Sequence, residues 1–265
     1  ACLLARHGAL RRVVAHKLAH RWAPQQISGW LARRYPDNDS MRVSHETIYR
    51  SLFIQARGVL KKQLLAHLRT QRSVRYPQAQ GRHGKGRKGG PNLIAQALTI
   101  SQRPAEANDR AVPGHWEGDL LAGTIHSHIV TLVERRSRFV MLIKIPARDS
   151  ATVVDAVAKH IRRLPAELKR SLTWDRGPEM YQHQRFKLAT DLQIYFCDPH
   201  SPWQRGSNEN TNGLLRQYFP KGQDVSHYTQ AQLNAVAKEL NQRPRQTLDF
   251  QSPAEVLNQT VASTD

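Results

Sequence analysis

The sequence is poor in cysteine, in acidic residues and in long apolar runs. Its two cysteines, Cys2 and Cys197, exclude a disulfide framework and the paired-cysteine spacing of zinc sites. No run approaches the roughly 18 apolar residues that span a bilayer, and Leu3-Leu4-Ala5 is too short for a signal-peptide core. We therefore expect a cytoplasmic protein without membrane partners. Because Ala1 falls inside a predicted helix, we also expect an upstream segment to be missing.

Positive charge is abundant and unevenly distributed. The chain has 40 Lys and Arg against 21 Asp and Glu, a net charge of +19. Residues 1–103 hold 20 basic and 3 acidic side chains, whereas residues 104–265 hold 20 and 18. The basic half favours a polyanion such as nucleic acid, and the nearly neutral half keeps the carboxylates that a metal site needs. The alternative is a ribosomal-type basic extension on an ordinary domain.

Apolar residues recur at helical spacing over residues 3–21 and 24–35, and Ser44 can cap a third helix. Short helices joined by turns resemble a helix-turn-helix, with the recognition helix over residues 44–50. A basic helical spacer is the alternative. In the helix-turn-helix interpretation, the residues that contact duplex DNA are Ser44, His45, Thr47 and Arg50.

A Gly-rich and basic stretch, residues 81–91, predicts a flexible linker within residues 76–103. It separates a helical module (1–75) from a larger domain (104–265). In that domain β-rich runs at 115–121, 129–134 and 139–145 precede alternating helices and strands. The fold class expected is α/β, with a mixed five-stranded sheet flanked by helices.

Three acidic residues come from three separate elements of this domain. Asp119 sits in the first predicted strand, Asp175 directly follows the strand 172–174, and Glu209 opens a helix. Each has a plainer explanation by itself, such as a turn or a strand-edge position. Hard divalent cations prefer oxygen ligands, and two such ions about 4 Å apart can support an in-line displacement at phosphorus.

The spacing of these acids, with 55 residues between Asp119 and Asp175 and 33 between Asp175 and Glu209, resembles that of the DDE transposases and integrases, which have a ribonuclease-H-like core. Three stretches, 114–119, 131–135 and 205–221, also resemble motifs of such enzymes. Within that group they resemble the insertion-sequence-thirty transposase family, over nearly the entire chain. The resemblance implies a transposase that binds the inverted-repeat ends of an element and cuts and joins double-stranded DNA. It also implies two Mg²⁺ (or Mn²⁺) ions held by Asp119, Asp175 and Glu209, and a homo-oligomer working on the bacterial nucleoid.

Glu209, Asn212 and Arg216 fall at i, i+3 and i+7, so one helix face presents an acid, an amide and a guanidinium. We interpret Glu117 as an acid that supports the ligands or as structural, rather than as a ligand itself. Asp175 is followed by Arg176-Gly177-Pro178, where integrase-like enzymes usually have Asn-Gly. A metal-dependent nuclease of the same fold, or a partial copy that only binds DNA, remain alternatives. The DNA contacts predicted in this domain are Arg205, Asn212, Arg216 and Lys221.

Overall fold

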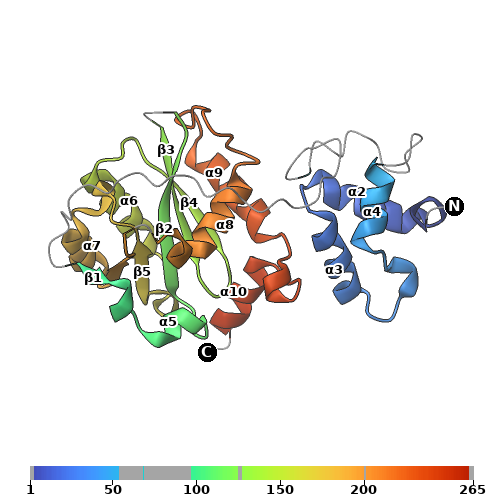
Figure 1. Cartoon of the computed structure of the whole chain (residues 1–265), viewed down its shortest axis with the longest axis horizontal. Helices are drawn as coiled ribbons and strands as arrows, with labels where there is room; N and C mark the ends of the chain where they lie inside the picture. Colours follow the sequence, from blue (N-terminus) through green and yellow to red (C-terminus); the bar gives the residue numbers. More distant parts are fainter. Residues whose placement is uncertain (1–2, 54–67, 69–96, 125–126, 200, 263–265) are drawn as a thin grey trace. The chain divides into compact units, whose positions relative to one another are not determined.

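The computed structural model describes residues 3–53, 68, 97–124, 127–199 and 201–262 (Figure 1). The chain divides into two compact units, residues 1–84 with 242–255 and residues 85–241 with 256–265. The sequence placed all of 104–265 in one domain, so it did not anticipate that 242–255 packs with the amino-terminal helices. The Gly-rich stretch 81–91 lies outside the described residues.

The first unit contains α1 (Leu3–Arg6), α2 (Gly8–Ala19), α3 (Pro24–Arg34) and α4 (His45–Phe53). The Ser44 hydroxyl accepts a hydrogen bond from the Thr47 amide at 3.2 Å, the N-cap contact expected for α4. The helices α3 and α4 lie where the sequence predicted them, whereas the single helix expected over residues 3–21 is divided at His7 into α1 and α2. Their buried apolar side chains include Leu10, Leu18, Ile27, Leu31 and Ile48.

The segment 242–255 packs against α3. A Cβ on Gly29 would lie 2.2 Å from the Phe250 ring, so the absence of a side chain at Gly29 lets the two approach. The Gln26 amide donates to the Pro244 carbonyl at 2.9 Å. A turn around η7 (Gln246–Leu248) carries Phe250, and α10 (Pro253–Ala262) follows it.

The second unit is built on a six-stranded sheet in the order β1-β6-β5-β2-β3-β4. The long strands β2 (His115–Ala122), β3 (His128–Glu134) and β4 (Val140–Lys144) form an antiparallel meander. On the other side of β2, the strands β5 (Ser171–Trp174), β6 (Gln193–Phe196) and β1 (Leu98–Thr99) run parallel. Five of these strands were predicted. The sixth, β1, lies in the predicted linker.

Helices cover both faces of the sheet (Figure 1). On one face, α6 (Ser150–Ile161) and α7 (His183–Thr190) pack over Trp116, Leu172 and Trp174. On the other, α8 (Gly206–Leu215) and α9 (Gln230–Asn241) pack over Leu121 and Val133. Residues 117, 119 and 121 alternate with Trp116, so Asp119 faces the α8 side. Within the described ranges, no helix has the length and apolarity needed to cross a membrane.

Candidate active site

Two of the three predicted acids come together where β2 and β5 run side by side. Asp119 lies on β2, opposite Thr131 of β3, and Asp175 immediately follows β5. The parallel pairing of His115 with Ser171 and of Glu117 with Thr173 sets this register. Asp119 and Asp175 therefore project from neighbouring strands on the same side of the sheet.

A single guanidinium lies between these two carboxylates. Arg205 Nη1 is 3.2 Å from Asp119 Oδ1, and Arg205 Nη2 is 3.1 Å from Asp175 Oδ2. Nη1 also donates to the Gly118 carbonyl at 3.0 Å. Arg205 is the N-cap residue of α8, so the helix that carries Glu209 is anchored to both acids by the residue just before its first turn.

A buried asparagine fixes α8 on the sheet. The Asn208 amide group donates to the Glu117 and Thr131 carbonyls at 2.9 and 3.2 Å, and its backbone N–H donates to Glu117 Oε2 at 2.9 Å. The other Glu117 oxygen pairs with Arg135, and Glu117 is fully buried. Both carboxylate oxygens of Glu117 are thus bonded within the protein, as expected for an acid with a supporting or structural role.

Glu209 and Asn212 lie on the same face of α8 as Arg205, because spacings of four and three residues bring side chains together on a helix. The Asn212 amide donates to Asp119 Oδ2 at 2.9 Å. Glu209 is exposed, and its side chain forms no hydrogen bond or ion pair with any described residue. Across the described residues, no three His, Cys, Asp or Glu side chains are already gathered around a possible metal position. The side chains of Asp119 and Asp175 therefore lie close together, whereas that of Glu209 lies on the neighbouring helix α8 and faces solvent.

Electrostatics distinguish the groups of this site. Burial raises the pKa of Asp119, although Arg205 opposes the shift. Burial lowers the pKa of Arg205, but Asp119 and Asp175 outweigh it and leave that pKa raised. Glu179, which accepts a hydrogen bond from Trp174 Nε1 at 3.3 Å, has a pKa raised by burial and by Asp175. The raised pKa values of Asp119 and Glu179 therefore reflect mainly their burial, and the charge of Asp175 adds a smaller contribution to each.

Two polar atoms beside the acids are buried without a hydrogen-bond partner among the described residues: Arg205 Nε and Asn212 Oδ1. An unsatisfied amide oxygen next to a carboxylate suits a hydrated cation, which offers donors through its water ligands. The donor set of Asp119, Asp175, Glu209 and Asn212 thus fits a hard divalent ion. Arg205 is the group that such an ion would have to displace or accommodate.

The residues predicted to contact DNA have varied surroundings. Ser44 and Thr47 bond each other at the start of α4, and His45 lies 3.4 Å from Glu46. Arg50 and Lys221 are exposed. Arg205 and Asn212 are tied to the acids, and Arg216 donates to the Ala122 and Phe219 carbonyls at 2.9 and 3.2 Å. That these residues bind DNA stays a prediction.

Sequence reasoning missed Asn208 and the bridging position of Arg205. Asn208 lies inside a run of polar residues, 207–212, in which local periodicity does not mark a buried position. Its burial follows from pairing with Glu117 and Thr131, far away in the sequence.

Comparisons with known proteins identify relatives of this chain. Residues 109–202 match the family model "Integrase core domain". The transposase InsI for insertion sequence element IS30A of Escherichia coli K12 is 46% identical over 264 residues, covering 100% of this chain and 68% of the relative. The transposase for insertion sequence element IS1086 of Cupriavidus metallidurans is 47% identical over 261 residues, covering 98% and 75%.

Among solved structures, the catalytic core domain of BIV integrase aligns with a TM-score of 0.44 and 18% identity, over 57% of this chain and 97% of that chain.

Proposed function

Because this chain belongs to the IS30 family of insertion-element transposases, with a ribonuclease-H-like integrase core, we propose that it cleaves and joins DNA with divalent ions held by Asp119, Asp175 and Glu209. The observation that supports this most is the pair of carboxylates at β2 and β5 that share the Arg205 guanidinium. Two carboxylates that already lie close enough to share the Arg205 guanidinium are also close enough to bind a divalent metal ion together.

Asp119 and Asp175 would hold Mg²⁺ or Mn²⁺, with Glu209 completing the set from α8. Bound there, the ions supply Lewis-acid stabilisation of the charge that develops on the attacking and leaving oxygens. Asn208 and Arg205 hold α8 at the sheet, which keeps Glu209 and Asn212 on the reacting side. No covalent protein nucleophile is required, because water and then a DNA 3′-hydroxyl can attack phosphorus.

The amino-terminal unit would select the DNA ends. In this proposal α4 is the recognition helix of a helix-turn-helix, with His45 and Arg50 reaching the duplex and Ser44 and Thr47 fixing the start of the helix. Lys221 and Arg216 would hold phosphates near the acids. Two element ends must be brought together, so we propose a homo-oligomer assembled on DNA at the bacterial nucleoid.

Strand transfer on pre-cleaved inverted-repeat DNA tests this function. Asp119→Asn, Asp175→Asn and Glu209→Gln should each abolish joining while leaving DNA binding intact. The matched control is Asp155→Asn, since Asp155 is an exposed carboxylate whose ion-pair partner, Arg185, lies at 2.7 Å on α7. The control should join DNA as the unchanged chain does.

The alternatives give different products in the same assay. Cleavage of uncut element ends without any joining would favour the metal-dependent nuclease. Binding without either reaction would favour a partial copy that acts only as a DNA-binding protein. Full activity in the Glu209→Gln variant would remove Glu209 from the ligand set.

A further inference from the structure

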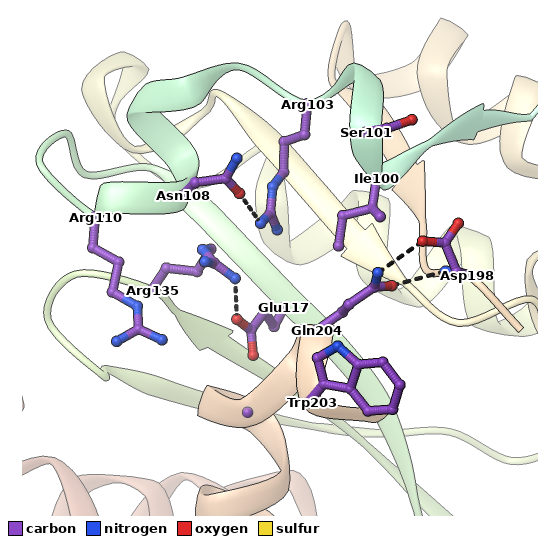
Figure 2. A pocket seen from close by; sticks show the side chains of 11 residues that line it. Ile100, Ser101, Arg103, Asn108, Arg110, Glu117, Arg135, Asp198, Trp203 and Gln204 are labelled. Atoms are coloured by element: carbon purple, nitrogen blue, oxygen red, sulfur yellow. Dashed lines mark hydrogen bonds and ion pairs between the residues drawn. The ribbon is translucent and has the colours of Figure 1, made fainter. Parts of the chain in front are cut away.

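A pocket of about 400 Å³ lies beside the acids, on the α8 side of the sheet (Figure 2). Glu117 of β2, two residues before Asp119, lines it together with the segment that leads into Arg205. Its walls come from η3 (Ile100–Gln102), the end of α5 (Ala105–Asp109) and η6 (Pro202–Arg205). A pocket of this size can hold one small ligand but not the width of a duplex.

Three arginines line one side of this pocket, and only one of them forms an ion pair with an acidic side chain among the described residues. Arg135 pairs with Glu117. Arg103, only 7% exposed, donates to two neutral oxygens, Thr173 Oγ1 at 3.0 Å and the Asn108 amide. Neither Arg103 nor Arg110 has a carboxylate within ion-pair distance in the described part of the chain.

Both of these arginines also leave a donor unused. The Nε atoms of Arg103 and Arg110 are buried and lack a hydrogen-bond partner within the described ranges. Burial, followed by repulsion from Arg135, lowers the pKa of Arg103 to about 10. A buried cation with a free donor is costly unless an anion binds there. The arginine side of the pocket is thus built for a group with several acceptor oxygens, such as a phosphate.

An exposed indole borders the same pocket. Trp203 is 71% exposed, although a tryptophan side chain is normally largely buried. In Figure 2 the Trp203 ring lies across the pocket from Arg103, Arg110 and Arg135. The Gln204 and Asp198 side chains, bonded to each other at 2.8 Å, lie next to the ring. Exposed indoles beside cationic grooves are stacking surfaces for unpaired bases.

We propose that this pocket receives one unpaired nucleotide of the reacting DNA strand, its phosphate on Arg103 and Arg110 and its base on the Trp203 indole. The inference rests on the proposed function, because Trp203 and Gln204 lead directly into Arg205 between the acids. A DNA strand whose phosphate lies at Asp119 and Asp175 would then continue into the pocket. The base must leave its stack to enter, so frayed or forked ends are the preferred form of the substrate.

The first test observes Trp203 directly in the full chain. The five tryptophans give a sparse set of indole N–H signals in a ¹⁵N NMR spectrum, and the Trp203 signal is the one lost in Trp203→Phe. The probe is the thymidine dinucleotide with a 5′-phosphate. It should shift the Trp203 signal saturably, while sodium phosphate at equal ionic strength should not. A Trp203 signal that stays in place, or that phosphate alone moves equally, overturns the proposal.

The second test compares two DNA probes of equal length, one fully paired and one with three unpaired nucleotides at its end. Trp203→Ala should weaken binding of the forked probe by about 5- to 30-fold and leave the paired probe unchanged. Trp203→Phe should retain most of the preference. Leu188→Ala is the matched control, since Leu188 is an apolar side chain that is 89% exposed on α7. Equal binding of the forked probe by Trp203→Ala and Leu188→Ala refutes the pocket.

The same variants separate this inference from the proposed function. Asp119→Asn should lose joining but keep the preference for forked DNA. If the chain prefers forked DNA through Trp203 but never joins DNA, the pocket is supported and the proposed transposase chemistry is contradicted. If the chain joins DNA equally well with and without Trp203 and binds both probes alike, the transposase chemistry is supported and the pocket is contradicted.

Discussion

Arg205 is the group whose removal tests the electrostatics of the site most sharply. In Arg205→Gln the carboxylates of Asp119 and Asp175 lose the cation that they share, at 3.2 and 3.1 Å. Arg205 is 11% exposed and Asp119 23%, so their contact behaves as a largely buried pair. Breaking such a pair costs ~3–5 kcal/mol, because it leaves a charge without compensation.

Solvent reduces this figure at Asp175. Its side chain is 39% exposed, so its contact with Arg205 is screened and adds at most ~1 kcal/mol. Asp119 can also take up a proton, since burial already raises its pKa. We therefore expect Arg205→Gln to lower the free energy of unfolding by ~2–4 kcal/mol, which corresponds to a fall in Tm of about 5–15 °C for a unit of this size.

Added magnesium should reverse much of this loss. A divalent ion between Asp119 and Asp175 replaces the missing guanidinium, so millimolar MgCl₂ should raise the Tm of Arg205→Gln more than that of the unchanged chain. Arg185→Gln is the matched control, because it removes the same charge from a pair whose side chains are 54% and 56% exposed. The control should melt within a few degrees of the unchanged chain.

The assay is thermal unfolding by calorimetry or intrinsic fluorescence, with and without MgCl₂, at one fixed ionic strength. Two results would refute the reasoning. The first is an Arg205→Gln variant that melts like Arg185→Gln. The second is a magnesium effect of equal size in both variants, which would show that the ions bind elsewhere.

Other predictions follow from local packing. Gly118→Ala should destabilise the second unit by ~3 kcal/mol or more in chemical denaturation, because the new Cβ would lie 2.0 Å from the Trp174 ring. Gly206→Ala is the control: its Cβ would meet nothing within 4 Å, so it should be neutral or slightly stabilising. The Cys197 thiol is buried and burial raises its pKa to about 11, so iodoacetamide at pH 8 should label it slowly in the native chain and rapidly in urea, as read by mass spectrometry; rapid native labelling would contradict the burial. The thiol stays protonated in the folded chain, so its contribution to stability is complete below its unfolded pKa and is lost as the pH rises towards 11. Ser44→Ala should cost ~1 kcal/mol through the lost N-cap bond of α4, measured by the Tm of the first unit, and an unchanged Tm would show that this bond does not stabilise the helix.

The sequence predicts the elements of this chain well where local patterns are strong. The strands β2, β3, β4 and β5 and the helix α3 lie within a few residues of the predicted ranges, because alternation and helical periodicity are local signals. Two-residue strands such as β1 are too short to show alternation. The parallel partner of β1, Tyr195 and Phe196 of β6, is also distant in the sequence.

Contacts between distant residues explain the rest. The packing of Phe250 on Gly29 joins segments more than 200 residues apart, and neither residue has a pattern that signals it. The positions of Asp119 and Asp175 were predictable from motif spacing, but their common partner was not. The DNA contact of Arg205 stays a prediction, but its ion pairs with both acids could not be predicted from the sequence.

The most direct test of the central claim is the position of the ions themselves. Crystals of the full chain with element-end DNA and Mn²⁺, measured at the manganese absorption edge, would locate each ion by its anomalous signal. We predict ions at coordination distance, about 2.0–2.2 Å, from carboxylate oxygens of Asp119 and Asp175, with Glu209 turned inward to join them. Manganese bound away from Asp119 and Asp175, or Glu209 still facing solvent in that complex, would contradict it.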